Sequence, residues 1–199
     1  FLRFGVISIR SLVKYVLKFS NETFLNELIW REFFMQILFH FPNSSTSSFK
    51  SKYDNIKWVN DKKMFEAWKN GKTGFPIVDA GMNELNKTGF MHNRVRMITS
   101  SFLCKQLLID WRWGEKYFAL KLNDYEMSSN VGNWQWASGS GVDAAPYFRI
   151  FNPYTQIEKF DKNYDYINNW IDLNNKYPKE IVNHKEAREN CLKTYKMYV

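Results

Sequence analysis

Apolar residues recur along most of this chain at the spacing of an α-helix, whereas the strict alternation of a β-strand is scarce. Signals for helix ends punctuate the pattern. Asn21 and Asp61 have short polar side chains that cap the free N–H groups of a first turn, and Pro76 suits the first turn itself. Gly89 supplies the left-handed residue that often follows a last turn. The sequence therefore predicts an all-α fold.

The order of these signals predicts where the helices lie. Residues 93–111 are expected to form the longest regular helix, and residues 44–57 a loop. From residue 124 to 156 the chain is rich in Gly, Ser, Asn and Pro, so this stretch is expected to be irregular and functional, with Trp134 and Trp136 arguing against disorder. The C-terminal helix is expected to be charged and on the surface. The predicted helices are 9–19, 21–39, 61–70, 76–89, 93–111, 115–122 and 181–198.

Aromatic residues make up 18% of the 199 residues, with 8 Trp, 11 Tyr and 17 Phe. One interpretation is a core built from large flat side chains. The other is that some rings stack on a planar ligand or on bases. Composition leaves both interpretations open.

The net charge is +8 and the pI is near 9.3, which favours polyanionic partners, nucleic acid first and an anionic membrane second. Cys104, Cys191 and three isolated His match no metal spacing, so no metal site is expected and a reducing, cytoplasmic environment fits. No apolar run is long enough for a membrane span. The opening residues 1–5 read as the middle of a domain, so a fragment is expected.

Charged residues share a helix face with large rings in the predicted second helix. Glu27, Trp30, Arg31 and Phe34 fall at i, i+3, i+4 and i+7. The acid and the Arg are either a satisfied interior ion pair or part of a pocket for a polar aromatic ligand. The residue types do not decide between the two.

Two arginines begin the predicted helix from Asn93, where the helix dipole disfavours a cation. Arg94 and Arg96 therefore indicate an outside partner for at least one of them, such as a carboxylate or a phosphate. Asp124 and Glu126 are candidate partners. A solvated charge cluster is the alternative.

Four segments of the chain form recognisable motifs: NELIWREF at 26–33, KTGFPIVDAGMNEL at 72–85, FMHNRVRMITSSFLCKQLLIDWR at 90–112 and SNVGNWQWASGSGVDAAPYFRIF at 129–151. Together they resemble class I photolyases of the cryptochrome/photolyase family. The resemblance implies that residues 1–199 form the family's FAD-binding catalytic helical domain. It also implies that the N-terminal α/β domain with its antenna pigment (folate or deazaflavin) and the phosphate-binding Thr/Ser segment are missing, and that the chain is shortened near 170–178.

The resemblance further implies light-dependent repair of cyclobutane pyrimidine dimers in DNA. In this family, excited reduced FAD passes an electron to a flipped-out dimer, the dimer splits and the electron returns. Asn130 matches the position that faces flavin N5, and Glu126 stands where the family usually has Asp. The positions that match flavin contacts are Phe24, Glu27, Arg31, Phe90, Asn93, Arg96, Asp124, Tyr125, Glu126 and Asn130.

The substrate side of the resemblance combines stacking, hydrogen bonding and charge. Glu27 and Asn130 are also expected to act in catalysis, and a monomer that binds damaged DNA and no membrane is expected. The positions that match substrate or DNA contacts are Glu27, Trp30, Arg31, Asn93, Arg94, Met97, Trp136 and Gln156. Those that match the family's electron-relay tryptophans are Trp58, Trp111 and Trp134.

Two other functions compete with repair. A cryptochrome-type blue-light photoreceptor would have the same fold, but Asn130, Met97 and Trp136 favour repair. A flavin-free nucleic-acid-binding remnant would fit a fragment that lacks the phosphate-binding segment.

Overall fold

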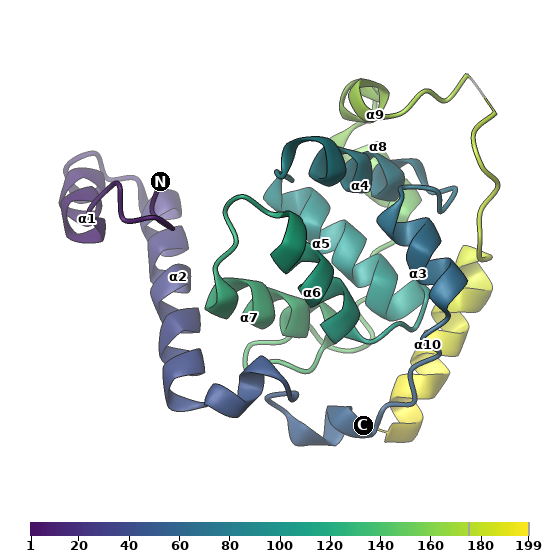
Figure 1. The fold of residues 1–199 in the computed structure, drawn as a ribbon, viewed down its shortest axis with the longest axis horizontal. Helices are drawn as coiled ribbons and strands as arrows, with labels where there is room; N and C mark the ends of the chain where they lie inside the picture. The colour runs from purple at the N-terminus through teal and green to yellow at the C-terminus, as the bar shows by residue number, and fades with distance from the viewer. Residues whose placement is uncertain (175, 199) are drawn as a thin grey trace.

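Helices account for all the regular structure in residues 1–174 and 176–198, which are the residues that the computed structural model describes (Figure 1). The all-α prediction is confirmed. One part of the shortened stretch at 170–178, residue 175, lies outside the described residues. The elements are α1 Ile9–Lys18, α2 Glu22–His40, η1 Pro42–Ser45, η2 Ser51–Asn55, α3 Lys62–Lys69, α4 Pro76–Thr88, α5 Asn93–Ser101, η3 Phe102–Gln106, α6 Trp111–Lys121, α7 Met127–Ser138, α8 Pro153–Phe160, α9 Asp165–Trp170 and α10 His184–Tyr198.

Several predicted helix ends are confirmed by the capping contacts. The Asn21 side chain accepts a hydrogen bond from the N–H of Phe24 at 3.0 Å, and Asp61 accepts one from Met64 at 2.9 Å. Gly89 has a φ of 72°, so it ends α4 in the left-handed conformation. Local side-chain chemistry therefore determined where α2, α3 and α4 begin or end.

The prediction of one long helix over residues 93–111 is wrong. The α-helical hydrogen bonds of α5 give way to a π-helical turn in η3, and Leu108 then has a φ of 48°, which no helix tolerates. Asp110 caps a new helix by accepting from the N–H of Arg112 at 3.0 Å. Helix α6 therefore starts at Trp111, four residues before its predicted start. The longest described helix is α2, with 19 residues.

The prediction that residues 124–156 are irregular is also wrong, because this stretch contains α7 and the start of α8 Pro153–Phe160. Glu126 caps α7, and Gly139 ends it with a φ of 91°. Helix α7 packs against α2, α5 and α6, so burial of its apolar side chains outweighs the low helix propensity of its Ser, Asn and Gly residues. The expected loop at 44–57 contains η1 and η2, and α9 was not predicted.

Aromatic rings from α3, α6 and α7 form the centre of the core. Trp68, Trp111 and Trp134 are almost completely buried, and the Trp134 ring centroid lies 4.9 Å from that of Phe118 and 6.1 Å from that of Trp68. A Cβ on Gly114 would lie 2.1 Å from the Trp134 ring, so only glycine allows α6 to approach α7 this closely. The core interpretation of the aromatic residues therefore holds for these rings.

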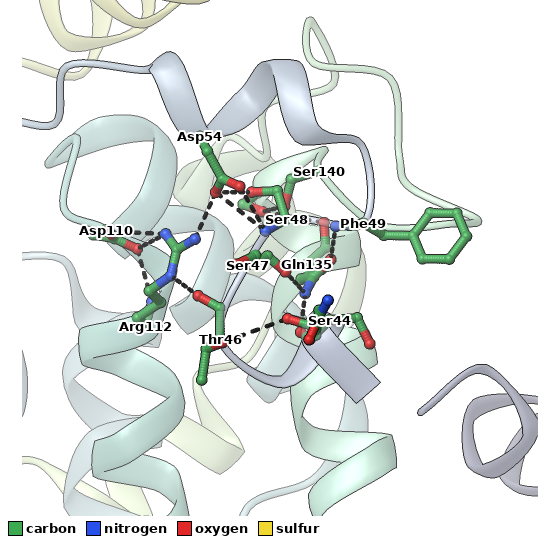
Figure 2. A network of polar contacts seen from close by, with 12 residues as sticks. Ser44, Thr46, Ser47, Ser48, Phe49, Asp54, Asp110, Arg112, Gln135 and Ser140 are labelled. Carbon is green, nitrogen blue, oxygen red and sulfur yellow. Dashed lines mark hydrogen bonds and ion pairs between the residues drawn. The ribbon is translucent and has the colours of Figure 1, made fainter. Parts of the chain in front are cut away.

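A polar network attaches the η1–η2 segment to α6 and α7 (Figure 2). Gln135 of α7 donates to the carbonyl of Ser44 at 2.7 Å and accepts from the N–H of Phe49 at 2.8 Å. Arg112 of α6 pairs with Asp54 at 2.5 Å and donates to the carbonyl of Thr46 at 2.6 Å. These contacts satisfy backbone groups that a loop would otherwise leave unpaired.

Lys105, in the η3 turn, is a buried cation in the core. Its Nζ donates to the carbonyls of Ser138 at 2.9 Å and Tyr147 at 3.2 Å, and it lies 3.8 Å from the centroid of the Tyr195 ring. These contacts connect the end of α7, the following loop and α10. Tyr195 and Cys191 are fully buried, so α10 is not only a surface helix as predicted. Burial lowers the pKa of Lys105 to about 8.

The lowered pKa predicts how stability depends on pH. Between about pH 8 and 10.5 the folded protein has lost the Lys105 proton while the unfolded chain keeps it, so this group makes the free energy of unfolding rise with pH. The unfolding free energy of the wild type minus that of Lys105→Met should therefore rise by about 1 kcal/mol per pH unit in this window. Urea unfolding at pH 7, 8.5 and 9.5 measures it. A difference that stays constant would contradict the prediction.

Candidate functional site

Two adjoining hollows share one wall made by α5 and α7. The first encloses about 600 Å³ and the second about 700 Å³, part of each volume being open to solvent. The shared wall consists of Asn93, Met97, Asn133 and Trp136. The other residues of the first hollow are Arg96, Ser100, Phe118, Leu122, Asp124, Tyr125, Glu126, Ser129, Asn130 and Trp134. Those of the second are Glu27, Trp30, Phe34 and Asp143.

Arg96 is held in place on the wall of the first hollow. Its Nε donates to the carbonyl of Met91 at 2.7 Å, and its guanidinium pairs with Asp124 at 2.9 Å. The expected carboxylate partner of Arg96 is therefore confirmed. Arg94 instead lies over the ring of Phe160, with its Cζ 4.5 Å from the centroid. The first hollow thus presents one oriented cation.

Glu126 does not pair with an arginine but caps α7. Its carboxylate accepts from the N–H groups of Ser128 at 3.0 Å and Ser129 at 2.9 Å, and from both hydroxyls. Partial burial raises its pKa, but these hydrogen bonds outweigh burial and hold the pKa below its ordinary value. Glu126 therefore fixes the start of the helix that carries Asn130, although it also borders the hollow.

Asn130 lines the first hollow and is bound from behind by Glu115. Its Nδ2 donates to the carboxylate of Glu115 at 3.0 Å and to the backbone carbonyl of the same residue at 3.2 Å. Burial raises the pKa of the same carboxylate. Sequence reasoning missed Glu115, because nothing in its surroundings along the chain distinguishes it from a surface acid.

The second hollow combines rings with polar groups. The Trp30 ring is 43% exposed and stacks on Phe34 with centroids 6.0 Å apart. Trp136 lies on the shared wall, and the Cζ of Arg149 lies 5.8 Å from the centroid of its ring. Arg149 and the hollow-lining Asp143 were not predicted as site residues; their signal was a charge next to aromatic residues in the 143–151 segment.

The remaining predicted residues lie outside these two hollows. Phe24 is exposed on α2, and Arg31 borders a separate open hollow with residues of the first ten. Phe90 borders a third hollow together with Asn93, Arg96 and Asp124. Gln156 lines no described hollow, and its Oε1 is buried without a hydrogen-bond partner among the described residues.

The three tryptophans predicted as a relay differ in burial. Trp134 lines the first hollow, and Trp111 belongs to the same core cluster, in which both are almost completely buried. Trp58 is half-buried, packs against that cluster and contacts the Tyr195 ring edge-on at 6.1 Å. In the described part of the chain no ring contact joins the three indoles directly.

Over residues 1–174 and 176–198, no group of three or more His, Cys, Asp and Glu is placed to hold a metal ion. In the same residues, no helix combines the length and apolar character that crossing a membrane requires.

Comparison with known proteins gives a family match. Residues 24–174 match the family described as the FAD binding domain of DNA photolyase. The deoxyribodipyrimidine photo-lyase of Alkalihalophilus pseudofirmus is 42% identical over 98% of this chain and 48% of its own length. That of Escherichia coli is 46% identical over 88% of this chain and 42% of its own length. The chain therefore spans about half the length of these relatives.

Three solved structures are also similar to the chain in both fold and sequence. An archaeal photolyase from Sulfolobus tokodaii, solved with two FAD molecules, has a TM-score of 0.91 and 42% identity over 98% of this chain and 48% of its own. A class III photolyase from Agrobacterium tumefaciens has a TM-score of 0.84 and 44% identity over 88% and 42%. A Synechocystis cryptochrome has a TM-score of 0.89 and 33% identity over 97% and 47%.

The capping role of Glu126 predicts a pH-dependent loss of stability on substitution. Glu126→Ala should lower the free energy of unfolding by about 1–2 kcal/mol at pH 7. Because the folded pKa is below its ordinary value of 4.5, this contribution is present above pH 4.5 and is lost as the pH falls through the folded pKa. Urea unfolding at pH 7 and pH 3 measures both values. Glu126→Asp, which keeps a capping carboxylate, is the control; equal losses in the two variants would contradict the capping role.

Proposed function

The chain belongs to the family of the FAD binding domain of DNA photolyase, and we propose that the protein repairs cyclobutane pyrimidine dimers in DNA in a light-dependent reaction, with FAD as its cofactor. The observation that carries this proposal is the pair of adjoining hollows with a common wall. A redox cofactor in one and a substrate in the other would be separated only by Asn93, Met97, Asn133 and Trp136. Bound FAD would supply light-driven single-electron transfer.

The residues of the first hollow fit the ring system of FAD. Its apolar wall includes Phe118, Leu122 and Trp134, which suits a flat heterocycle. The Arg96 guanidinium is oriented by Asp124 and matches the negative charge of a reduced flavin. The carboxamides of Asn93, Asn130 and Asn133 can donate to or accept from the polar ring edge.

The second hollow supports the binding of an extrahelical dimer. Trp30 and Trp136 would stack on the two unpaired bases, Met97 would complete the apolar wall, and Glu27 would bond a polar edge. Arg149 and Arg94 are exposed or half-exposed cations that would contact phosphates around the opening. A net charge of +8 supports DNA as the partner. We also propose that the protein acts as a monomer inside the cell.

The remaining predicted contacts are part of the same proposal. Phe24, Arg31 and Phe90 would bind parts of the cofactor that extend beyond the first hollow, and Gln156 would face DNA. Trp58, Trp111 and Trp134, in that order, would carry an electron from the surface to the cofactor. The burial of Trp134 beside the first hollow and the greater exposure of Trp58 support that order.

Two finer assignments compete within the family. We propose class I from the four segments quoted above, and class III is the competing class because such an enzyme is among the similar structures. A blue-light photoreceptor is the second candidate function, favoured by the cryptochrome likeness. Asn130, which offers a neutral amide to the first hollow, favours repair.

The primary test measures cofactor and reaction in the purified chain. We expect a flavin absorption spectrum and loss of pyrimidine dimers from an irradiated oligonucleotide under blue light but not in darkness. Bound flavin without light-dependent repair would favour the photoreceptor, and absence of bound flavin would contradict the cofactor assignment.

In the same preparation, Trp30→Ala should weaken binding of dimer-containing DNA while flavin occupancy stays unchanged. Loss of one stacking contact corresponds to about 1–3 kcal/mol, or roughly 5- to 150-fold in affinity. Fluorescence anisotropy with damaged and undamaged oligonucleotides measures it. Phe39→Ala removes another exposed ring of α2 that does not line the second hollow, and it should change neither affinity. Unchanged discrimination in Trp30→Ala would remove Trp30 from the substrate site.

The proposed relay predicts a separation of two light-dependent reactions. Trp134→Phe keeps an aromatic ring of similar shape, but phenyl is much harder to oxidise than indole. Photoreduction of bound FAD by an external electron donor should slow sharply, while repair by chemically reduced protein should continue. Absorption spectra under illumination and dimer counting measure the two rates. Normal photoreduction at full flavin occupancy would show that Trp134 serves only as core.

A further inference from the structure

The segment of residues 142–151, between α7 and α8, borders the second hollow. Asp143 lines the hollow, and the Cζ of the exposed Arg149 lies 5.8 Å from the centroid of the Trp136 ring. The Phe151 ring lies 6.4 Å from the same ring. Under the proposed function, this segment presents a carboxylate and a cation to DNA beside the stacking ring of Trp136.

Few hydrogen bonds hold this segment in place. Among the described residues, its backbone makes one internal hydrogen bond, donated by the N–H of Arg149 at 2.8 Å. Two consecutive side chains of η3 reach the segment from outside. Lys105 donates to the Tyr147 carbonyl at 3.2 Å, and Gln106 donates to the Phe151 carbonyl at 2.7 Å. Arg149 therefore lies between two carbonyls that the π-helical turn holds.

Lys105 also connects the segment to the end of α7. Its buried Nζ donates to the carbonyl of Ser138 at 2.9 Å and lies 3.8 Å from the centroid of the Tyr195 ring. Ser138 is the last residue of α7, two positions after Trp136. One ammonium group therefore fixes the segment relative to the helix that carries Trp136.

A cation in this place is unfavourable for stability alone. No carboxylate in the described part of the chain forms an ion pair with Lys105, and burial lowers its pKa to about 8. An apolar side chain of similar length would avoid burying a charge. What the ammonium group provides instead is several hydrogen-bond donors at one point. The residue type therefore suits positioning better than packing.

We propose that Lys105 is a positioning residue that holds the 142–151 segment against the end of α7, so that Arg149 meets DNA beside Trp136. This inference rests on the proposed function for its consequence, because that function assigns the second hollow to damaged DNA. Lys105 itself lines neither hollow and acts through the segment.

Release of the segment can be measured without DNA or cofactor, by trypsin cleavage after Arg149. In Lys105→Met this cleavage should be about tenfold faster than in the wild type, because a hydrogen bond to a charged donor is lost. Cleavage after Arg112, which is held by Asp54 and by the carbonyl of Thr46, reports global unfolding. An unchanged ratio of the two cleavage rates would overturn the proposal.

Tyr195→Phe is the matched control for damage to the core. It removes the hydrogen bond from the Tyr195 hydroxyl to the carbonyl of Ser138, at 2.8 Å, but keeps the ring that faces Lys105. It should therefore lower stability and leave the cleavage ratio unchanged. A ratio raised as much as in Lys105→Met would show that any loss of core contacts releases the segment, and would contradict the positioning role.

In the wild type, pH provides a test that needs no variant. The charged or titratable groups that face Lys105 or act on its immediate neighbours are Tyr53, Cys104, Asp110, Tyr147, Arg188, Cys191 and Tyr195. Burial raises the pKa of both thiols and of the Tyr195 hydroxyl, so these three groups stay neutral between pH 7 and 9.

The Lys105 ammonium is present below about pH 8 and loses its proton above it, which weakens its hydrogen bonds. The cleavage ratio should therefore rise severalfold from pH 7 to pH 9 in the wild type but stay constant in Lys105→Met. A wild-type ratio that does not change with pH would overturn the proposal, even if the Met variant fails to fold.

The consequence for DNA is tested through the salt dependence of binding. Each phosphate contact contributes about one unit to the slope of log Kd against log salt concentration. Arg149→Ala should reduce the slope for dimer-containing DNA by about one unit, and Lys105→Met should do the same although Lys105 is buried. In the double variant the slope should fall no further than in Arg149→Ala.

An unchanged slope in Lys105→Met would overturn the proposal. A further fall in the double variant would indicate a direct effect of the Lys105 charge on DNA and would also overturn it. Failure of the wild-type chain to bind DNA would instead contradict the proposed function, and the cleavage ratio would still decide whether Lys105 holds the segment.

Discussion

The close contact of α7 with its neighbours is the constraint on which the site depends. Two glycines make it possible: a Cβ on Gly114 would lie 2.1 Å from the Trp134 ring, and a Cβ on Gly132 would lie 2.2 Å from the Phe34 ring. Aromatic rings fill the space that the missing side chains leave, so α6 and α2 approach α7 from two directions. Both hollows have α7 as a wall, and their shapes therefore follow from this packing.

Most charged and amide groups around the first hollow are bound to protein before any ligand arrives. Arg96 pairs with Asp124, Glu126 caps α7, and Glu115 holds Asn130. Each contact restricts a side chain that would otherwise sample several rotamers. A ligand therefore meets groups that are already oriented, and less conformational entropy is lost on binding.

The second hollow is arranged differently, which suits a different ligand. Trp30 and Trp136 are partly exposed there. Asp143 lines the hollow, and the exposed Arg149 of the same segment between α7 and α8 lies near the Trp136 ring. Exposed rings and cations suit a partner that arrives from solution with flat bases and phosphates. The first hollow is thus the more enclosed of the two, which would suit a bound cofactor. The second is the more open, which would suit a transient substrate.

The sequence by itself determined the helical class, the caps at Asn21 and Asp61 and the stop at Gly89, because these depend on contacts within one turn. Its four quoted segments also identified the family and most residues of the two hollows. It did not reveal the break after Ser101 or the helix from Met127 to Ser138, because a π-turn and a helix rich in Ser, Asn and Gly are stabilised by packing against distant segments. Tertiary structure alone brought Glu115 behind Asn130, since contacts between α6 and α7 leave no periodic pattern in the sequence.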